Sequence, residues 1–482
     1  MYRLQHQMIE TELSDIVGRD CVVTAEADRL IYGVDYFWLP RMLVDRGQTP
    51  PLPDFVVLPG SVEELAAIVR LANQHQIPLI PWGGGSGSQG GIVPVYGGIT
   101  VDLKRLNRMI DIDTTSQTVT AQAGIGGYEL ECALNAQGYT LPHYPASVHA
   151  ATLGGYLAAR GSGTISTKYG KAEDMVLSIQ VVLPNGDVMR TLPVPNHAAG
   201  PGILQLFVGA EGSYGIITEA TMRLERLPEE RRFRSFLFPD IHAGLEAGRR
   251  IMLDRLQPLV IRLYDEPSTI KTIRRVLGTE VDHGTYMVIG FDGRRELVDV
   301  QEKLAFAICA EYQAEDLGEE LGRQWWEHRY DFYFPPKTLD LPWMFGTLDT
   351  VCTYDKLEPL YWGKKQILEE RYNAWGIFYY AHFSHWFPWG AMIYDRFIIE
   401  NPPADPDEAL ALHNEIWDEA IKANLKYGAV LNEHHGVGLK MARHVRKQFG
   451  AGFQVLEGLK HALDPHNIMN PGKMGFGPVK RG

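Results

Sequence analysis

The chain has 482 residues, of which 46 are Lys or Arg and 59 are Asp or Glu, so its formal charge is −13. This length is too great for one hydrophobic core and predicts two or three structural units. The acidic balance and the lack of a basic run argue against nucleic acid as a partner.

The composition also bears on location and covalent bonding. The N-terminus lacks the apolar core of a signal peptide, and no apolar stretch approaches the roughly 20 residues that span a bilayer. We therefore expect a cytoplasmic protein without a transmembrane segment. Cys21, Cys132, Cys309 and Cys352 are dispersed, which predicts buried free thiols rather than a disulfide framework or a thiolate metal site. The sequence leaves a homodimer open.

The predicted elements begin with a helical N-terminal arm over residues 1–50. Residues 54–58 form an apolar run typical of a strand, and Ser61 and Glu64 have the spacing of a capping box that opens an amphipathic helix. A second strand is predicted over residues 77–80. It leads directly into a loop that is rich in glycine.

Six glycines occur in the nine residues 83–91. Because glycine lacks a Cβ, consecutive N–H groups can turn into one concavity and a phosphate can approach the backbone closely. A G-x-G-x-x-G pattern is present, but residues 91–98 cannot begin the helix that this dinucleotide fingerprint requires, and no Lys-Ser or Lys-Thr follows as in a P-loop. We interpret the loop as a diphosphate cradle. The alternative is a surface linker, which the apolar runs on both sides argue against.

Three further clusters of small residues follow the glycine loop. They lie at residues 151–155, 159–163 and 209–218. A strand is predicted over residues 118–124, a helix over 128–137, and a hairpin at Pro184-Asn-Gly186 between strands at 175–183 and 187–191. Small residues allow a large flat ligand to lie against the backbone. The four clusters predict one extended cofactor bed in an α+β unit.

After residue 228 glycines become sparse and aromatic residues frequent, which marks a second domain. Pro402 and Pro403 form a break before a predicted helix over residues 407–427. We expect four segments: an N-terminal arm at 1–50, a cofactor-binding domain at 51–228, a cap domain for the substrate at 229–425, and a C-terminal segment at 426–482.

Several motifs follow one another in a recognisable order. They are the glycine loop, Pro145-Ala-Ser147, Thr152-Leu-Gly-Gly155, Glu211-Gly-Ser-Tyr-Gly-Ile-Ile-Thr218 and Asn470-Pro-Gly-Lys473. This order resembles the vanillyl-alcohol-oxidase superfamily of FAD flavoproteins, which have the PCMH-type fold. Arg160-Gly-Ser-Gly163, Ile261-Arg-Leu-Tyr-Asp265 and His434-His-Gly-Val-Gly438 resemble the branch that contains the alkyldihydroxyacetonephosphate synthases and FAD-linked oxidases. The resemblance covers most of the chain.

The resemblance implies an α+β fold with a two-lobed PCMH-type FAD-binding domain and an α+β cap domain over the flavin ring. It also implies that the C-terminal segment returns to the FAD-binding domain and packs on the flavin. FAD is the implied cofactor. Because neither the glycine loop nor its flanks contains a histidine, we expect FAD to be bound non-covalently.

Carried over position by position, the resemblance assigns contacts with FAD to several loops. The diphosphate contacts are Trp82, Gly83, Gly84, Gly85, Ser86, Gly87 and Ser88, the flavin and ribityl contacts are Pro145, Ser147, Thr152, Gly155, Ser162 and Tyr169, and the adenosine contacts are Glu211 and Ile217. Relatives often have Arg in place of Trp82. Because such a loop binds through its backbone N–H groups, this departure need not weaken diphosphate binding.

Oxidation of an alcohol requires a base that takes the hydroxyl proton while a hydride passes to the flavin N5 atom. The resemblance places His434 and His435 at the flavin, and an imidazole titrates near neutral pH. At least one of the two has the alternative of a structural, hydrogen-bonded histidine. Tyr394 matches a tyrosine that acts as an acid or base, with a core aromatic residue as the alternative. Arg262 matches an arginine that faces the active site, with a surface ion pair to Asp265 as the alternative.

Glu433 occupies a position at which the synthases have a third histidine. This difference weakens the synthase assignment, and the Glu-His pair is similar to the D-lactate and glycolate dehydrogenase branch. Some members of that branch bind a metal through His and Glu, which His382, His385 and Glu433 could imitate. Because the two histidines are only three residues apart, the spacing does not match and we expect no metal.

Aromatic residues are dense in the second domain. They include Trp325, Trp326, Tyr330, Phe332, Tyr333, Phe334, Trp343, Phe345, Phe383, Trp386, Phe387 and Trp389. Such a belt predicts an aromatic-walled cavity, with an ordinary cap core as the alternative. We therefore expect an FAD-dependent oxidoreductase that acts on a CH–OH group of a small-molecule substrate, a bulky or aromatic alcohol. The alternatives are a non-redox transferase that exchanges an acyl for an alkyl group, a D-2-hydroxy-acid dehydrogenase, and a flavin-carrying protein without a substrate.

Overall fold

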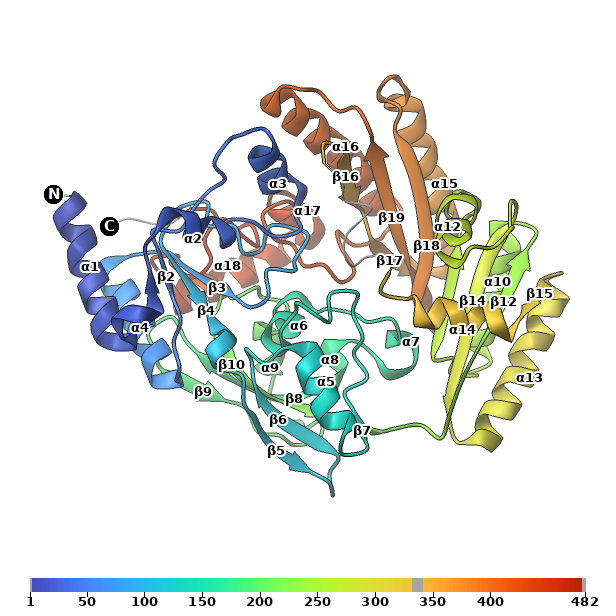
Figure 1. Cartoon of the computed structure of the whole chain (residues 1–482), viewed down its shortest axis with the longest axis horizontal. Coiled ribbons are helices and arrows are strands. Elements are labelled where there is room, and N and C mark those ends of the chain that lie inside the picture. Colours follow the sequence, from blue (N-terminus) through green and yellow to red (C-terminus); the bar gives the residue numbers. More distant parts are fainter. Residues whose placement is uncertain (1, 332–340, 479–482) are drawn as a thin grey trace.

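A computed structural model describes residues 2–331 and 341–478 of the chain. Helices and strands are mixed in both halves, and the α+β class expected from the sequence is confirmed (Figure 1). A four-stranded and a five-stranded sheet lie in the first half of the chain, and an eight-stranded sheet lies in the second half. We call this eight-stranded sheet, with the helices packed on it, the cap.

The N-terminal arm is largely helical, as the sequence predicts, and its described residues include three α-helices. They are α1 (Tyr2–Val17), α2 (Glu26–Ile31) and α3 (Trp38–Asp45). Ile9, Leu13 and Val17 of α1 are buried against the first sheet, whereas Trp38 of α3 is buried in the core of the cap. The arm therefore connects the two halves of the molecule.

The first sheet holds the glycine loop at the end of a strand. Its order is β1 (Val22–Val23), β2 (Phe55–Val57), β4 (Ile99–Asp102) and β3 (Leu79–Trp82), with β2, β4 and β3 parallel. The predicted helix is α4 (Val62–His75), and Ser61 Oγ accepts the Glu64 N–H at 3.1 Å as an N-cap. The predicted strand at 77–80 is displaced, because β3 begins at Leu79 and continues to Trp82. The loop thus starts at Gly83, and no helix follows it through residue 98.

The second sheet is antiparallel. Its order is β5 (Met109–Asp113), β6 (Thr118–Gln122), β10 (Ile216–Arg223), β8 (Val176–Val182) and β9 (Val188–Arg190). The predicted hairpin is confirmed by the pairing of Val182 with Val188. The helices α5 (Gly127–Asn135) and α6 (Leu153–Ala159) contribute Leu130, Leu153 and Leu157 to its core.

The cap sheet is antiparallel throughout its described strands. Its order is β15 (Glu315–Gly318), β12 (Glu230–Phe238), β14 (Thr285–Gly293), β13 (Val260–Tyr264), β18 (Phe378–Phe387), β19 (Gly390–Ile399) and β16 (Met344–Thr347), and β17 (Thr350–Thr353) also pairs with β19. The larger cap helices are α10 (Ile241–Leu253), α13 (Arg295–Glu311), α14 (Glu319–Glu327), α15 (Tyr354–Arg371) and α16 (Pro406–Lys426). The last of these is the helix predicted at 407–427.

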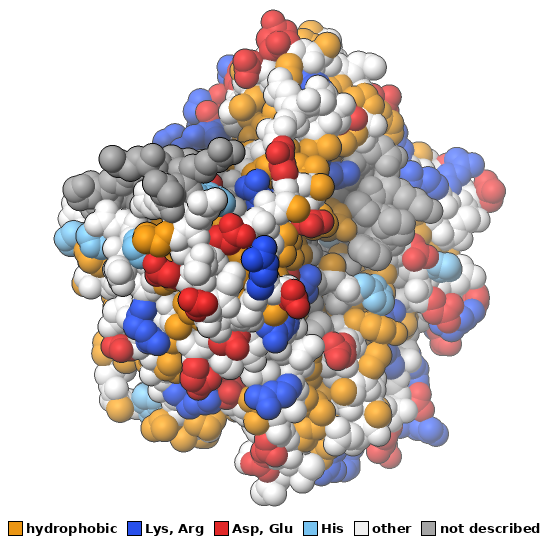
Figure 2. All heavy atoms as spheres, turned by 60° about the vertical axis from the view of Figure 1, so that its left-hand side comes forward, with side chains coloured by type: hydrophobic (Ala, Val, Ile, Leu, Met, Phe, Trp, Pro, Cys, Tyr) orange, Lys and Arg blue, Asp and Glu red, His pale blue; other side chains and the backbone are white. Residues whose placement is uncertain are grey.

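The end of the chain returns to the first sheet, as expected. Leu79 of β3 donates its N–H to Ile468 and accepts the Asn470 N–H at 2.7 Å. Figure 1 shows α17 (Val445–Phe449) and α18 (Gly452–Leu463), in red, close to the blue elements of the first half. Acidic and basic side chains are intermixed on the face in Figure 2. Within the described residues, every helix is too short or too polar to cross a bilayer.

Candidate active site

A cavity of about 330 Å³ is lined by residues from both halves of the molecule. This volume lies within the usual range of small-molecule and cofactor sites. The first half contributes the glycine loop and the loops around residues 145–163 and 211–217, and the cap contributes residues of β13, β18 and β19. His434, His435 and Asn470 of the C-terminal segment complete the lining.

Close packing explains why the loop contains glycine at successive positions. A Cβ on Gly84 would lie 1.7 Å from the carbonyl oxygen of Ala150, and a Cβ on Gly83 would lie 2.4 Å from Thr152 Oγ1. Gly85 has a φ of +61°, which favours glycine. The loop can therefore approach the residue 150–152 turn only because these side chains are absent.

Several buried polar atoms of residues that line the cavity have no hydrogen-bond partner within the described part of the chain. They are Asp35 Oδ2, Trp82 Nε1, Gln89 Oε1, Tyr156 OH and Asn470 Oδ1. Buried polar groups in folded proteins are nearly always paired, so these atoms indicate a polar ligand. A long cofactor with a diphosphate, hydroxyl groups and a ring system fits this combination of donors, acceptors and glycine backbone.

Most of the predicted cofactor contacts lie on this cavity. They are Trp82, Gly83, Gly84, Gly85, Ser86, Gly87, Ser88, Pro145, Ser147, Thr152, Gly155, Ser162, Glu211 and Ile217. Tyr169 does not line it. Its hydroxyl donates to Asp292 Oδ1 at 2.8 Å, and Lys168 Nζ lies 2.7 Å from the same oxygen. Tyr169 therefore joins the first half to strand β14 of the cap.

His435 is held in one tautomer by a buried carboxylate. Its Nδ1 donates to Asp349 Oδ1 at 2.6 Å, and Asp349 is fully buried in the turn between β16 and β17. Asn432 Nδ2 donates to the same oxygen at 3.0 Å. Burial lowers the pKa of His435 below its usual value, although the Asp349 charge opposes this shift. His435 is therefore neutral near pH 7, with its Nε2 lone pair available to accept a proton.

His434 has the opposite charge state. Its Nδ1 lies 2.7 Å from Glu433 Oε2 and 3.2 Å from Asp349 Oδ2. Burial opposes the charge, but these two carboxylates outweigh it and raise the pKa of His434 to about 9. Although burial disfavours its charge too, the two imidazoles hold the pKa of Asp349 below its usual value. The site thus places a cationic and a neutral imidazole side by side, with ring centroids 3.9 Å apart.

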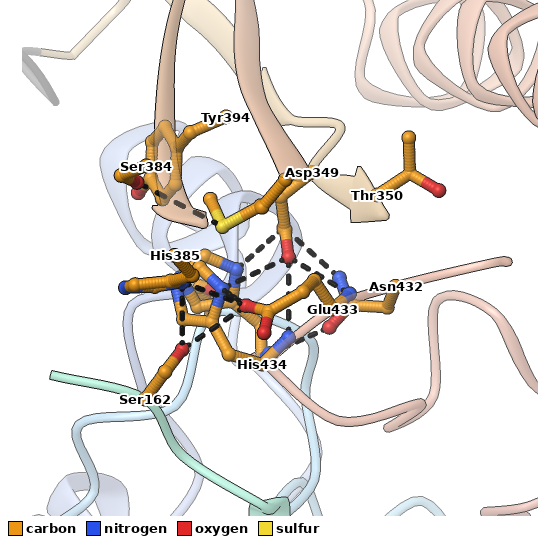
Figure 3. A network of polar contacts seen from close by, with 12 residues as sticks. Ser162, Asp349, Thr350, Ser384, His385, Tyr394, Asn432, Glu433 and His434 are labelled. Atoms are coloured by element: carbon orange, nitrogen blue, oxygen red, sulfur yellow. Dashed lines mark hydrogen bonds and ion pairs between the residues drawn. The ribbon is translucent and has the colours of Figure 1, made fainter. Parts of the chain in front are cut away.

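Glu433 stands at the centre of a buried polar network (Figure 3). Its Oε2 accepts from Ser162 Oγ at 3.0 Å and lies 3.1 Å from His385 Nδ1, and Lys171 Nζ lies 3.2 Å from its Oε1. Burial disfavours its charge, but Lys171 and His385 hold the pKa of Glu433 well below its usual value. Glu433 does not line the cavity. It contacts His434, which does.

Strand irregularity explains the position of His385. The pairing of β18 with β19 shifts between Ser384 and Trp386, and His385 has a φ of +48°. A bulge of this kind turns one side chain away from the regular alternation. His385 is thereby directed at Ser162 and Glu433 instead of into the cap core.

Tyr394 and Arg262 both line the cavity. The Tyr394 ring stacks on His382 with centroids 4.6 Å apart, and its hydroxyl accepts from Arg396 Nη2 at 2.9 Å. Arg262 does not pair with Asp265, whose carboxylate instead accepts N–H and O–H groups of Ser268, Ala381 and Tyr361. The surface ion pair considered for Arg262 is therefore absent from the described residues.

Three arginines line the cavity: Arg262, Arg329 and Arg396. Arg262 and Arg329 form no ion pair with any carboxylate among the described residues, and the Nε atom of each is buried without a hydrogen bond. Burial and the charges of Arg262 and Arg396 lower the pKa of His382 well below its usual value. The cap side of the cavity is accordingly suited to an anionic group.

The described residues of the aromatic belt do not wall the cavity, which corrects the expectation of an aromatic-walled cavity. Trp325, Phe383 and Trp386 are fully buried, and Trp389 is exposed on the surface. Of the described belt residues, Phe345 lines the cavity. Phe332, Tyr333 and Phe334 lie outside the described residues. Aromatic density along the sequence did not distinguish side chains that face the core from those that face the cavity.

Two groups of side chains in the described chain have the composition of metal sites. His385, Glu433 and His434 bring one ligating atom each to within 4.8 Å of one another, and so do Asp349, His434 and His435. His382, considered as a ligand from the sequence, belongs to neither group. Because Lys171 already places a positive charge beside Glu433, the first group is balanced as an ion-pair network.

Sequence reasoning missed several residues of the site. Asp349 lay in a segment that resembles the synthase branch, Thr347-Leu-Asp-Thr350, but carried no role. Lys171 and Arg329 also lay in segments that resemble this branch, Lys168-Tyr-Gly-Lys171 and Trp326-Glu-His-Arg329, without a role, and Arg396 gave no signal beyond its charge. Asp35 belongs to the arm, which was not expected to reach the cofactor bed.

Comparisons with known proteins agree with this geometry. A family model for the "FAD binding domain" matches residues 53–192, and one for "FAD linked oxidases, C-terminal domain" matches residues 227–474. The alkyldihydroxyacetonephosphate synthase of Trypanosoma brucei brucei is 30% identical over 498 residues, with 96% of this chain and 80% of that protein covered. The mitochondrial D-lactate dehydrogenase (cytochrome) of Arabidopsis thaliana is 27% identical over 432 residues, covering 88% and 73%.

Solved structures of similar proteins have the same fold. One of an alkyldihydroxyacetonephosphate synthase is 29% identical, with a TM-score of 0.82, and covers 97% of this chain and 86% of that chain. One of p-cresol methylhydroxylase has a TM-score of 0.77 at 19% identity over 98% and 97%, which shows the fold alone. The PCMH-type fold and the FAD cofactor inferred from the motifs are confirmed.

Proposed function

Because the chain belongs to the family of FAD-linked oxidases and acts with FAD, we propose that it oxidises a CH–OH group of a substrate that carries an anionic group. Bound FAD would supply the hydride acceptor. The observation that carries the proposal is the presence of a neutral His435, oriented by Asp349, in the same cavity as Arg262 and Arg329.

His435 is the general base in this proposal. Its Nδ1–H is engaged by Asp349, so Nε2 takes the proton from the substrate hydroxyl as the hydride leaves. The imidazolium that forms is stabilised by the same carboxylate. His434 is already protonated and cannot accept this proton. Its positive charge instead stabilises negative charge that develops next to it.

Arg262 and Arg329 bind the anionic group of the substrate. A carboxylate or phosphate can accept two parallel hydrogen bonds from one guanidinium, which fixes its orientation as well as its distance. Tyr394, held by Arg396 and His382, borders the same space and positions the substrate. Glu433 holds His434 in place. Its carboxylate is in turn fixed by Ser162, His385 and Lys171.

This substrate class differs from the bulky aromatic alcohol expected from the sequence. The argument for an aromatic substrate was the aromatic belt, and Phe345 is the one described residue of that belt that lines the cavity. A small hydroxy acid requires arginines or lysines around its carboxylate, and the described lining of the cavity includes three arginines. We also propose that FAD is held non-covalently, since the glycine loop contains no histidine.

A non-redox transferase is the second candidate. It is favoured by the 30% identity with the Trypanosoma synthase, and the same arginines could bind a phosphate ester. Glu433 in place of a third histidine argues against it.

The visible spectrum of bound flavin, recorded anaerobically during additions of substrate, separates these functions. We expect bleaching with one or more D-2-hydroxy acids or phosphorylated alcohols and none with neutral benzylic alcohols. Bleaching by neutral alcohols alone would contradict the anionic substrate class. Turnover of an acyl dihydroxyacetone phosphate without net bleaching would identify the transferase.

A further inference from the structure

The N-terminal arm places a carboxyl group against the glycine loop. Asp35 lines the cavity and is only 5% exposed. Its Oδ1 accepts the Phe37 N–H at 2.9 Å, whereas its Oδ2 has no hydrogen-bond partner and would lie 3.7 Å from a Cβ on Gly87. Tyr36 donates its N–H to the Gly87 carbonyl at 2.8 Å. Asp35 is thus fixed beside the loop that is shaped to hold the FAD diphosphate.

Two other buried charges lie near the same loop. Lys473 of the C-terminal segment is fully buried, and its Nζ donates to the Val93 carbonyl at 2.8 Å. Glu211 lines the cavity and interacts with Lys473, as Asp35 does. If all three groups are ionised, two negative charges face one positive charge. The diphosphate adds further negative charge, so full ionisation is unfavourable when FAD is bound.

Burial brings the pKa values of all three groups close to neutral pH. It raises the pKa of Asp35 to about 7, against the opposing effects of the Phe37 and Gly90 amides and the Lys473 charge. It also raises the pKa of Glu211 to about 7 and lowers that of Lys473 to about 8. A modest change in the local field is therefore enough to change their protonation.

Hydrogen bonding distinguishes the two carboxyl groups. Glu211 accepts the N–H groups of Val437 at 2.6 Å and Gly438 at 2.9 Å, and both bonds favour its ionised form. Asp35 accepts the N–H of Phe37 and retains an unpaired oxygen on which a proton can sit. Although the two pKa values are alike, Asp35 can therefore take up a proton without losing an amide hydrogen bond, whereas both oxygens of Glu211 accept one.

We propose that FAD binding is coupled to the uptake of one proton from solvent by Asp35, because the N-terminal arm holds this carboxyl against the diphosphate loop. Once Asp35 is neutral, Glu211 and Lys473 balance each other. The added proton also makes Asp35 a hydrogen-bond donor beside an anionic ligand. The proposal concerns FAD alone and is independent of the substrate and of the base.

The dissociation constant for FAD tests the coupling without any measurement of activity. Dilution of the holoprotein releases FAD, whose fluorescence reports the free fraction at each pH. Proton uptake by a group that titrates near pH 7 predicts a Kd that rises about tenfold between pH 6 and pH 8. The Asp35→Asn variant, which keeps the shape and cannot ionise, should change less than about twofold and bind about tenfold more tightly than the wild type at pH 8.

Two variants serve as controls. Asp28 is an exposed carboxylate on the same arm, so Asp28→Asn should keep the wild-type dependence on pH. Glu211→Gln tests the competing site. The proposal is overturned if Glu211→Gln removes the dependence while Asp35→Asn keeps it, or if Asp35→Asn weakens FAD binding equally at both pH values.

A measurement on the unmodified chain covers the case in which the Asp35 variant does not fold. Calorimetric titration of the deflavinated protein with FAD in two buffers of different ionisation enthalpy gives the number of protons taken up. We expect about half a proton at pH 7 and nearly one at pH 8. No uptake at either pH would overturn the proposal.

Discussion

At the scale of single residues, Asp349 gives two adjacent histidines different charges. It fixes the His435 tautomer through Nδ1 and, with Glu433, keeps His434 protonated. Because the hydrogen bond between Asp349 and His435 joins residues 86 positions apart, it becomes visible only in the folded chain. The sequence identified both histidines as candidates, but it could not determine which of them is the base.

The pH dependence of flavin reduction follows from these charges. His435 must be neutral to accept a proton, and its pKa lies below the ordinary value of 6.5, so activity should decline only on the acid side of that value. The charge of His434 is lost above about pH 9, where activity should fall again. A profile of kcat/KM against pH should therefore be bell-shaped, and His434→Gln should remove its alkaline limb. An unchanged alkaline limb in that variant would contradict the assignment.

Arg262 should act on substrate binding. Loss of hydrogen bonds to a charged group costs about 1.5–3 kcal/mol, so Arg262→Gln should raise KM for an anionic substrate about 10- to 150-fold. Arg295→Gln is a suitable control, because Arg295 is an exposed arginine paired with Glu230 at the surface. Steady-state kinetics of both variants, with the FAD content checked by absorbance, test this role. A loss of kcat at constant KM would show that Arg262 does not bind the anionic group.

At the scale of elements, the glycine loop depends on contacts with a second loop. The glycine content predicted the role of the loop, because a run of residues without side chains can be recognised in the sequence itself. It could not give the partner surface, which is the turn at residues 150–152. The shift of β3 to Leu79–Trp82 has the same kind of cause, because Leu79 pairs with the distant end of the chain.

Two alanine substitutions in this loop should have different effects. In Gly84→Ala the new Cβ would lie 1.7 Å from the Ala150 carbonyl, so the loop must move. Overpacking of this kind costs about 1–3 kcal/mol, which corresponds to FAD binding about 5- to 150-fold weaker. Gly91→Ala meets no atom within 4 Å and should bind FAD like the wild type. Equal FAD affinities for the two variants, measured by fluorescence, would contradict this account.

Successive side chains of strand β19 point alternately to the cavity and to the cap core. Tyr394 and Arg396 line the cavity, whereas Asp395 between them is fully buried and pairs with Lys364 of α15 at 2.7 Å. The sequence did not indicate this ion pair, because its partners come from different elements. The pair anchors the strand that carries Tyr394.

Removal of one partner should therefore destabilise the cap. Lys364→Met leaves Asp395 buried without its cation and should lower the free energy of unfolding by about 3–5 kcal/mol. Lys365→Met removes the neighbouring lysine, which pairs with Glu369 along the helix, and should cost at most about 1 kcal/mol. Denaturant unfolding of both holoproteins provides the comparison. Similar losses in the two variants would show that the buried pair has no special role.

At the scale of the whole molecule, the cavity is assembled from segments that are distant in the chain. We propose the boundaries expected from the sequence: an arm at 1–50, the FAD-binding domain at 51–228, the cap at 229–425 and a C-terminal segment at 426–482. Local patterns and the family resemblance predicted the cofactor and the fold. The resemblance also predicted that Arg262 faces the site. The contributions of Arg329 and Arg396 were not predicted, because their orientation depends on how the cap meets the first half.

The most direct test of the central claim is the rate of flavin reduction in anaerobic rapid mixing, with the wild type and His435→Gln. We predict that an anionic CH–OH substrate bleaches the wild-type flavin, that deuterium on the carbinol carbon slows this step, and that His435→Gln slows it about 10²- to 10⁴-fold while FAD stays bound. Bleaching of the variant at the wild-type rate would contradict the assignment of His435 as the base. Turnover of such a substrate without any bleaching would contradict the proposed oxidation.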